Sequence, residues 1–98
     1  MDRVMEIRHD EDGGKGVFYV EQEGQRPAEM TYVMSGESLM IIDHTEVASI
    51  FKGRGVGRQL VLAGVQFARE QKFKIVPLCP FANAEFSKHP EYSDVLSQ

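Results

Sequence analysis

The sequence predicts an α+β fold in which a mainly antiparallel mixed sheet ends in one parallel β-α-β unit. Apolar and polar residues alternate through much of the first half of the chain, a period of two that is typical of half-buried strands. One amphipathic helix follows over residues 56–71, and a short apolar run follows it over 74–78. Two strands that precede and follow a helix in the chain usually lie parallel in one sheet, with the helix as the crossover between them. We expect the 98 residues to form a single domain, residues 1–98.

Four strands are expected ahead of the helix. Residues 5–9 form the first, residues 11–14 turn the chain, and residues 16–23 return as the second strand of a hairpin, because they are rich in β-branched and aromatic side chains. The third strand spans 26–35. The fourth, 39–47, is apolar at its start and polar at its end, as expected of a strand that leaves the core for a site.

The chain after the helix predicts a cleft. Pro77 has no N–H, so the strand 74–78 must be partly unpaired from its parallel neighbour, 39–47. Parallel strands that separate at their carboxyl ends leave a crevice in which such sheets usually bind ligands. A short helix is expected over 79–88, and the polar tail 93–98 is expected to fray.

Composition and charge exclude several classes of protein. A net charge of -4 and a pI near 5.3 disfavour nucleic acid as a ligand and suit a positively charged amine. No strictly apolar run is longer than the four residues Leu39–Ile42, so we expect no membrane segment, and without a signal-peptide core we expect a cytoplasmic protein. Cys79 is the single cysteine, which excludes an internal disulfide and a multi-cysteine zinc site, and we expect no metal.

The stretch 50–58 joins the fourth strand to the long helix and carries the strongest chemical signal. Alternating glycines let the backbone approach a ligand, and a helix that begins here leaves its first amides without intrahelical partners. These amides, the helix dipole and the basic side chains favour a phosphate or diphosphate. The sequence matches neither a P-loop nor a dinucleotide fingerprint. We therefore expect an anion site formed by Lys52, Gly53, Arg54, Gly55, Val56, Gly57 and Arg58.

Four stretches share their order and spacing with one known family: Asp43–Val47, Phe51–Gly57, Lys74–Phe81 and His89–Tyr92. They resemble the minimal GCN5-related N-acetyltransferases (GNAT) of the YjdJ type, and the resemblance covers residues 5–96. It implies a trimmed GNAT fold, with the parallel β-α-β unit splayed around a coenzyme A (CoA) site. It also implies acetyl-CoA as the acyl donor and a primary amine as the acceptor.

The resemblance assigns roles to individual residues. The catalytic pair of the family falls on His44 and Cys79, which the predicted strands place on the two sides of the cleft. Asn83 matches an asparagine that hydrogen-bonds the pantetheine arm in GNAT proteins, and Val47 joins the donor site at the end of its strand. The GNAT helices that cover the acceptor site have no room here, so an open groove is expected. A protein lysine or N-terminus suits such a groove, and a small amine is also possible.

Two mechanisms are compatible with this pair of residues. In direct transfer, which we favour, the amine attacks the thioester while His44 accepts its proton and Cys79 protonates the departing CoA thiolate. In the covalent route Cys79 carries the acetyl group first. Two other functions remain as alternatives: a CoA-binding module without catalysis, and an interaction domain whose glycine loop is only a turn. We expect a monomer or a weak dimer.

Overall fold

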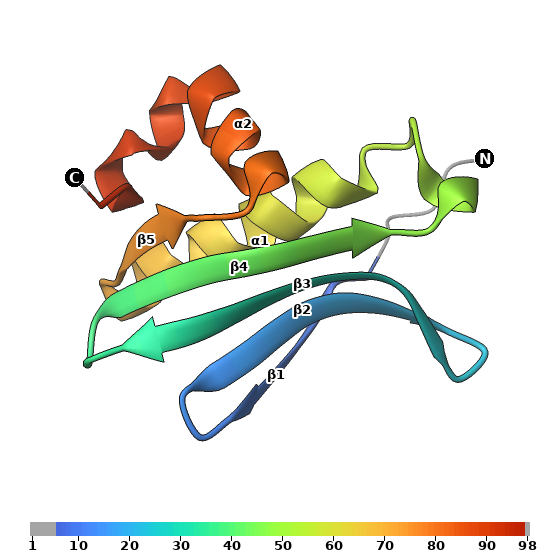
Figure 1. Cartoon of the computed structure of the whole chain (residues 1–98), viewed down its shortest axis with the longest axis horizontal. Helices are drawn as coiled ribbons and strands as arrows, with labels where there is room; N and C mark the ends of the chain where they lie inside the picture. Colours follow the sequence, from blue (N-terminus) through green and yellow to red (C-terminus); the bar gives the residue numbers. More distant parts are fainter. Residues whose placement is uncertain (1–5, 98) are drawn as a thin grey trace.

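The computed structural model describes residues 6–97, which form one five-stranded sheet with helices on one face and at one edge (Figure 1). The strand order is β1-β2-β3-β4-β5; neighbours are antiparallel except β4 and β5, which are parallel. This confirms the predicted mixed, mainly antiparallel fold. In chain order the elements are β1 Arg8–Asp12, β2 Lys15–Gln22, β3 Gln25–Ser35, β4 Leu39–Val47, η1 Ser49–Phe51, α1 Val56–Gln71, β5 Lys74–Pro77, α2 Pro80–Lys88 and η2 Pro90–Val95.

The first strand lies further along the chain than predicted. We expected it at 5–9, but β1 begins at Arg8 and includes Glu11 and Asp12, which we had placed in the turn; Met5 lies outside the described residues. The turn needs only Gly13 and Gly14, whose φ angles are 60° and 87°. Two residues with positive φ close a tight hairpin whose twist matches its strands, so the strand continues up to them.

Helix α1 covers one face of the sheet and builds the core. Met30 on β3 and Met40 and Ile42 on β4 are fully buried beneath it. The helix approaches closely at Gly64, where an added Cβ would lie 3.0 Å from the Met30 Cε. Full burial of a side chain of this size stabilises a fold by roughly 1.5–3 kcal/mol. The seam between α1 and the sheet is therefore the rigid base on which the site is built.

Strands β4 and β5 separate, as the position of Pro77 predicted. Their pairing runs from Leu39 with Lys74 to Ile42 with Pro77. The N–H groups of Leu78 and Cys79 then both donate to the Ile42 carbonyl, at 2.9 and 3.2 Å. Within the described chain, β4 continues to Val47 with no partner from β5 on that side. The gap between the strands opens toward the start of α1.

The C-terminal tail does not fray up to residue 97, contrary to our expectation. Ser97 N–H donates to the Ile75 carbonyl at 2.8 Å, next to a parallel bridge between Ile75 and Leu96. The Arg69 guanidinium on α1 donates to both carboxylate oxygens of Asp94, at 2.9 and 3.0 Å. The polar tail therefore finds its partners on α1 and β5, which local sequence does not reveal.

Candidate active site

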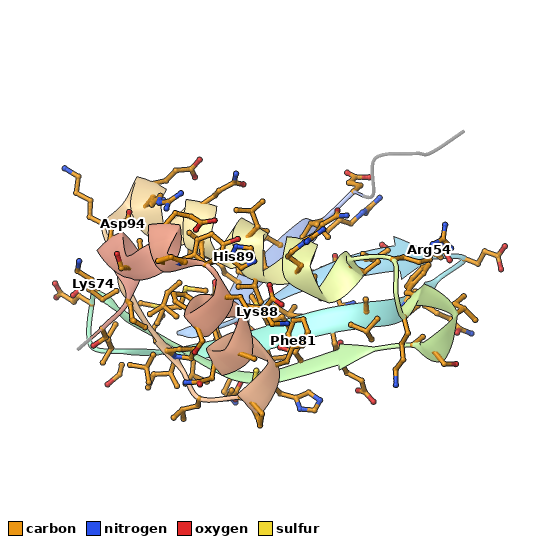
Figure 2. All side chains as sticks on the ribbon, turned by 90° about the horizontal axis from the view of Figure 1, so that it is seen from above. Arg54, Lys74, Phe81, Lys88, His89 and Asp94 are labelled. Atoms are coloured by element: carbon orange, nitrogen blue, oxygen red, sulfur yellow. The ribbon has the colours of Figure 1, made fainter. Side chains whose placement is uncertain are left out.

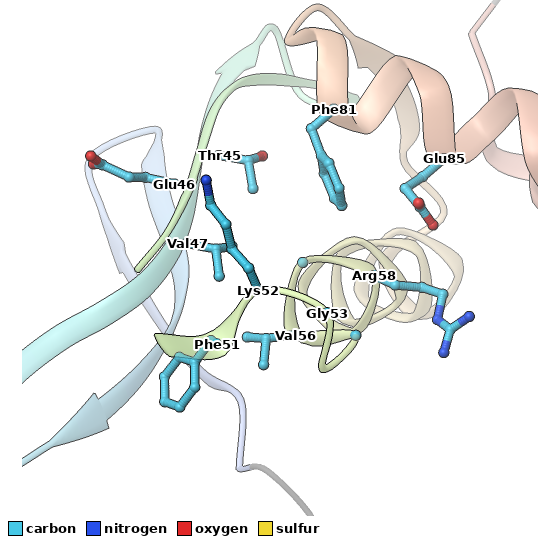
Figure 3. Close-up of a pocket in the computed structure, with 12 residues that line it drawn as sticks. Thr45, Glu46, Val47, Phe51, Lys52, Gly53, Val56, Arg58, Phe81 and Glu85 are labelled. Atoms are coloured by element: carbon cyan, nitrogen blue, oxygen red, sulfur yellow. The ribbon is translucent and has the colours of Figure 1, made fainter. Parts of the chain in front are cut away.

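A cavity of about 820 Å³ lies between the end of β4, the loop before α1, and the first turns of both α-helices. Volumes of roughly 300–1,000 Å³ are usual for sites that hold a cofactor or small molecule. Most of the residues predicted for the donor site line this cavity (Figure 3): Val47, Lys52, Gly53, Gly55, Val56, Gly57 and Arg58.

The N-terminus of α1 opens onto the cavity. Its N-cap is Gly55, with a φ of 75°, and the preceding Gly53 has a φ of 80°, both in the left-handed region that favours glycine. Among residues 6–97 no side chain caps this helix, and its first turn holds no acidic residue. The Gln59 N–H donates to the Gly55 carbonyl at 3.0 Å, so the amides of residues 56–58 have no intrahelical acceptor. Free amides and the helix dipole together favour the binding of an anion.

The three basic residues of the loop differ in where they point. Lys52 and Arg58 line the cavity, and the Lys52 side chain extends along β4 toward Thr45 (Figure 3). Arg54 lies outside the lining, with its guanidinium carbon 5.9 Å from the centre of the Phe51 ring. Figure 2 shows Arg54 at the end of the molecule, away from Phe81. Two of the three predicted cations are thus placed to meet a ligand in the cavity.

Cys79 is buried at the start of α2, where its side chain caps the helix. The Ala82 N–H donates to its Sγ at 3.4 Å, and only 6% of the residue is exposed. The Thr45 Oγ1 lies 3.2 Å from the same sulfur, across the gap between β4 and α2. Since Thr45 also lines the cavity, the thiol stands directly behind the cavity wall.

His44 does not share this contact, because it points to the opposite face of the sheet. Thr45 pairs with the buried Met30, which faces α1, whereas His44 pairs with Thr31. Successive side chains of a strand point to opposite faces, so His44 and Thr45 diverge. The His44 side chain is 59% exposed, and its Nε2 lies 3.6 Å from the Glu46 carboxylate. We expected His44 and Cys79 to face each other across the cleft, and Thr45 takes that place instead.

The cavity also contains residues that were not predicted as site residues, among them Phe81 and Glu85, whereas Asn83, like Arg54, was predicted for the donor site but lies outside the lining. Phe81 projects from α2 over the first turn of α1 (Figure 3), where a Cβ added to Gly57 would lie 2.6 Å from the Phe81 ring. Glu85, one turn further along α2, is also in the lining. Asn83 is exposed outside it, with its side-chain amide 3.5 Å from the Pro77 carbonyl. Ala82, Glu85 and Phe86 follow helical spacing, a signal that could have placed Glu85 on the buried face.

The described residues show neither a metal-binding cluster nor a membrane-spanning helix. Among residues 6–97 no three metal-ligating side chains converge on one point. No helix in the described part of the chain is long and apolar enough to cross a bilayer.

A mixed sheet whose parallel strands separate beside an uncapped helix N-terminus is typical of a class of proteins that bind phosphorylated ligands in the gap. Comparison with known proteins identifies the class. Residues 17–95 match the family model described as GCN5-related N-acetyl-transferase. The chain therefore belongs to the GCN5-related N-acetyltransferase family and is an acyl-CoA-dependent N-acetyltransferase, while the finer YjdJ-type grouping stays a prediction.

Individual relatives and solved structures are similar to most of this chain. The solution structure of a GCN5-like protein from Staphylococcus aureus is 36% identical, with a TM-score of 0.74, over 95% of this chain and 88% of that one. Protein NATD1 of Xenopus tropicalis is 29% identical over 92% of this chain and 84% of its own length. A GNAT family acetyltransferase from Elizabethkingia anophelis, solved with acetyl-CoA bound, shares the fold at 14% identity and a TM-score of 0.57, over 81% of this chain and 53% of that one.

Proposed function

We propose that this enzyme transfers the acetyl group of acetyl-CoA directly to a primary amine, with His44 and Cys79 acting from opposite sides of β4. The observation that carries the proposal is the continuity of one cavity from the uncapped start of α1 to Thr45, which contacts Cys79. A diphosphate on the amides of residues 56–58 leaves the rest of the donor to run along β4 toward the thiol.

The separation of the two catalytic candidates favours direct transfer over an acetyl-cysteine intermediate. A cysteine nucleophile needs a base within hydrogen-bond reach to take its proton. The side chain within that reach of Cys79 is Thr45, which is no base, whereas His44 lies on the other face of β4. Cys79 is therefore better suited to donate a proton than to attack.

The proposed reaction assigns one proton to each group. The amine nitrogen attacks the thioester carbonyl carbon, so that a C–N bond forms and the C–S bond breaks. His44 accepts the proton that the amine loses, and the Cys79 thiol gives its proton to the departing CoA sulfur. Exchange with water then restores both groups, and no oxidant or reductant is needed.

The acceptor in this proposal is a lysine side chain or N-terminus of a protein, reaching His44 from the open face of the sheet. His44 is mostly exposed, and among the described elements no helix covers that face of the sheet (Figure 1). Glu46 points away from the other cavity side chains (Figure 3) and lies beside His44, where it would attract a cationic amine. The net charge of -4 acts in the same direction.

The burial of Cys79 favours one second candidate function, a CoA-binding module without catalysis. A transfer assay with acetyl-CoA and a lysine-containing peptide library separates the two. The proposal requires acetylated peptide that depends on both His44 and Cys79. Donor binding without transfer to any amine would favour the binding module instead.

A further inference from the structure

Glu85 is a carboxylate in a place where apolar side chains are the rule. It lies on the face of α2 that is buried, together with Ala82 and Phe86, and only 5% of the residue is exposed. Burying an ionised carboxylate is unfavourable unless it is paired and hydrogen-bonded. The position therefore needs an explanation from its partners.

The partners within the protein leave half of this carboxylate unsatisfied. Among residues 6–97, Glu85 Oε1 accepts no hydrogen bond. The His89 Nε2 lies 3.4 Å from it without hydrogen-bond geometry, while the His89 Nδ1 is engaged with Glu91 at 3.1 Å. The exposed Lys88 ammonium is 3.9 Å from the other oxygen. One buried acceptor atom is thus left without a partner in the described part of the chain.

The Glu85 side chain belongs to the wall of the donor cavity. Glu85 lines that cavity one turn beyond Phe81, and Figure 3 shows its carboxylate directed toward the first turn of α1, on the side of Arg58. The same end of the cavity thus offers a cation for phosphate and an acceptor for a neutral group.

We propose that Glu85 Oε1 accepts a hydrogen bond from an N–H or O–H group of bound acetyl-CoA. The inference rests on the proposed function, since it assumes that the donor occupies this cavity. An ionised carboxylate is an acceptor only, so it cannot pair with the phosphates of the donor. Acetyl-CoA carries suitable groups on both sides of its diphosphate: amides and a hydroxyl on the pantetheine arm, and a ribose hydroxyl and an amino group on the nucleotide.

Removal of the Glu85 carboxylate changes acetyl-CoA affinity in opposite directions, depending on whether or not it accepts a hydrogen bond from the donor. A carboxylate that makes no bond to the donor only repels its phosphates, so its removal would tighten binding. A carboxylate that accepts a hydrogen bond in a buried site contributes more than this repulsion costs, so its removal weakens binding.

The test is calorimetric titration of the full chain with acetyl-CoA, using Glu85→Met, Glu85→Ala and Glu85→Gln. We expect the Met and Ala variants to bind about tenfold more weakly, because both lose the acceptor, and Gln to stay within about threefold, because it keeps an acceptor oxygen. Equal or tighter binding by Met and Ala would overturn the inference. If the unaltered chain fails to bind acetyl-CoA, the proposed function fails first.

Two further readouts sharpen the result. In the ligand-free protein we expect Glu85→Met to raise the melting temperature, because it removes an unsatisfied buried acceptor. A lowered melting temperature would mean that Glu85 serves as a structural partner of His89, which contradicts the inference. Titration with adenosine 3′,5′-bisphosphate locates the bond: a loss seen with both ligands places it on the nucleotide, and a loss with acetyl-CoA alone places it on the pantetheine arm.

Discussion

The Thr45 hydroxyl lies 3.2 Å from the Cys79 sulfur and bridges the point at which β4 and the chain after β5 separate. This contact ties the Cys79 thiol to β4 on the side that faces α1. It also puts Thr45, and not His44, next to the sulfur. We therefore expect the CoA thiolate to leave on the side of β4 that faces α1 and the amine to arrive on the opposite side.

Substitution of the loop cations tests the diphosphate site. We expect Lys52→Ala and Arg58→Ala each to weaken acetyl-CoA binding about tenfold, because each removes a charge-assisted contact with a phosphate. Arg54→Ala is the matched control: it removes the same charge from the same loop, but Arg54 lies against Phe51 outside the cavity lining. It should change the dissociation constant by less than about twofold, as exposed charges do. Equal effects of all three would mean that only net charge matters.

The Cys79 thiol is expected to act as an acid and never to carry the acetyl group. Cys79→Ala should lower kcat by roughly 10²–10⁴-fold, the usual contribution of a proton donor, and leave acetyl-CoA binding nearly unchanged. Rapid quench with labelled acetyl-CoA in the absence of an amine should yield unlabelled protein. An acetyl-Cys79 adduct that forms as fast as turnover would establish the covalent route and reverse this assignment.

The Gly57→Ala substitution should weaken acetyl-CoA binding without lowering the stability of the fold. The new Cβ would lie 2.6 Å from the Phe81 ring, which is 40% exposed and free to move aside. Since alanine is favoured over glycine inside a helix by about 1 kcal/mol, the melting temperature should hold or rise. The displaced ring narrows the cavity, so acetyl-CoA binding should weaken. The double variant Gly57→Ala, Phe81→Ala should recover part of the lost affinity; no recovery would mean that the ring is not what blocks the donor.

Stability should fall in mild acid because of His9 on β1. This imidazole stacks on Phe18 with ring centres 4.1 Å apart, and its Nε2 lies 2.6 Å from the Tyr32 hydroxyl. Burial raises the pKa of Tyr32 to about 12. Burial lowers the pKa of His9 below 6.5, against the opposing pull of Glu11 and Asp10. The folded state then binds a proton less readily than the unfolded state. The stability that the uncharged His9 contributes is fully present above pH 6.5 and is lost as the pH falls through the lowered pKa of His9 in the folded state.

The measurement is the free energy of unfolding in urea between pH 8 and pH 5. His9→Gln keeps a polar partner for Tyr32 but does not titrate, so its profile should be flatter than that of the unaltered chain. Parallel profiles for the two proteins would show that His9 does not cause the acid sensitivity.

The fold was largely predictable because its signals are local. The α1 helix has the bounds that its apolar stripe predicted, residues 56–71, and β4 has those of its run, 39–47. The first strand was placed wrongly because two glycines suffice for the turn. The order of the tail was missed because its partners, Arg69 and Ile75, are distant in the sequence. Contacts of this kind do not follow from a sequence pattern.

The site was predictable where it depends on the backbone and less so where it depends on the facing of side chains. Glycine spacing predicted the left-handed glycines and the free amides at the start of α1, because both follow from sequence position. The relation between His44 and Cys79 could not be predicted, because a bulge between Thr31 and Tyr32 shifts the β3–β4 register. One extra residue reverses which side chains face α1.

A crystal structure with CoA bound is the decisive measurement. We expect the diphosphate oxygens to accept hydrogen bonds from the amides of residues 56–58 and the CoA sulfur to lie on the α1 side of β4, beside Thr45 and Cys79. A diphosphate bound elsewhere on the protein, or a sulfur atom remote from Cys79, would contradict this expectation.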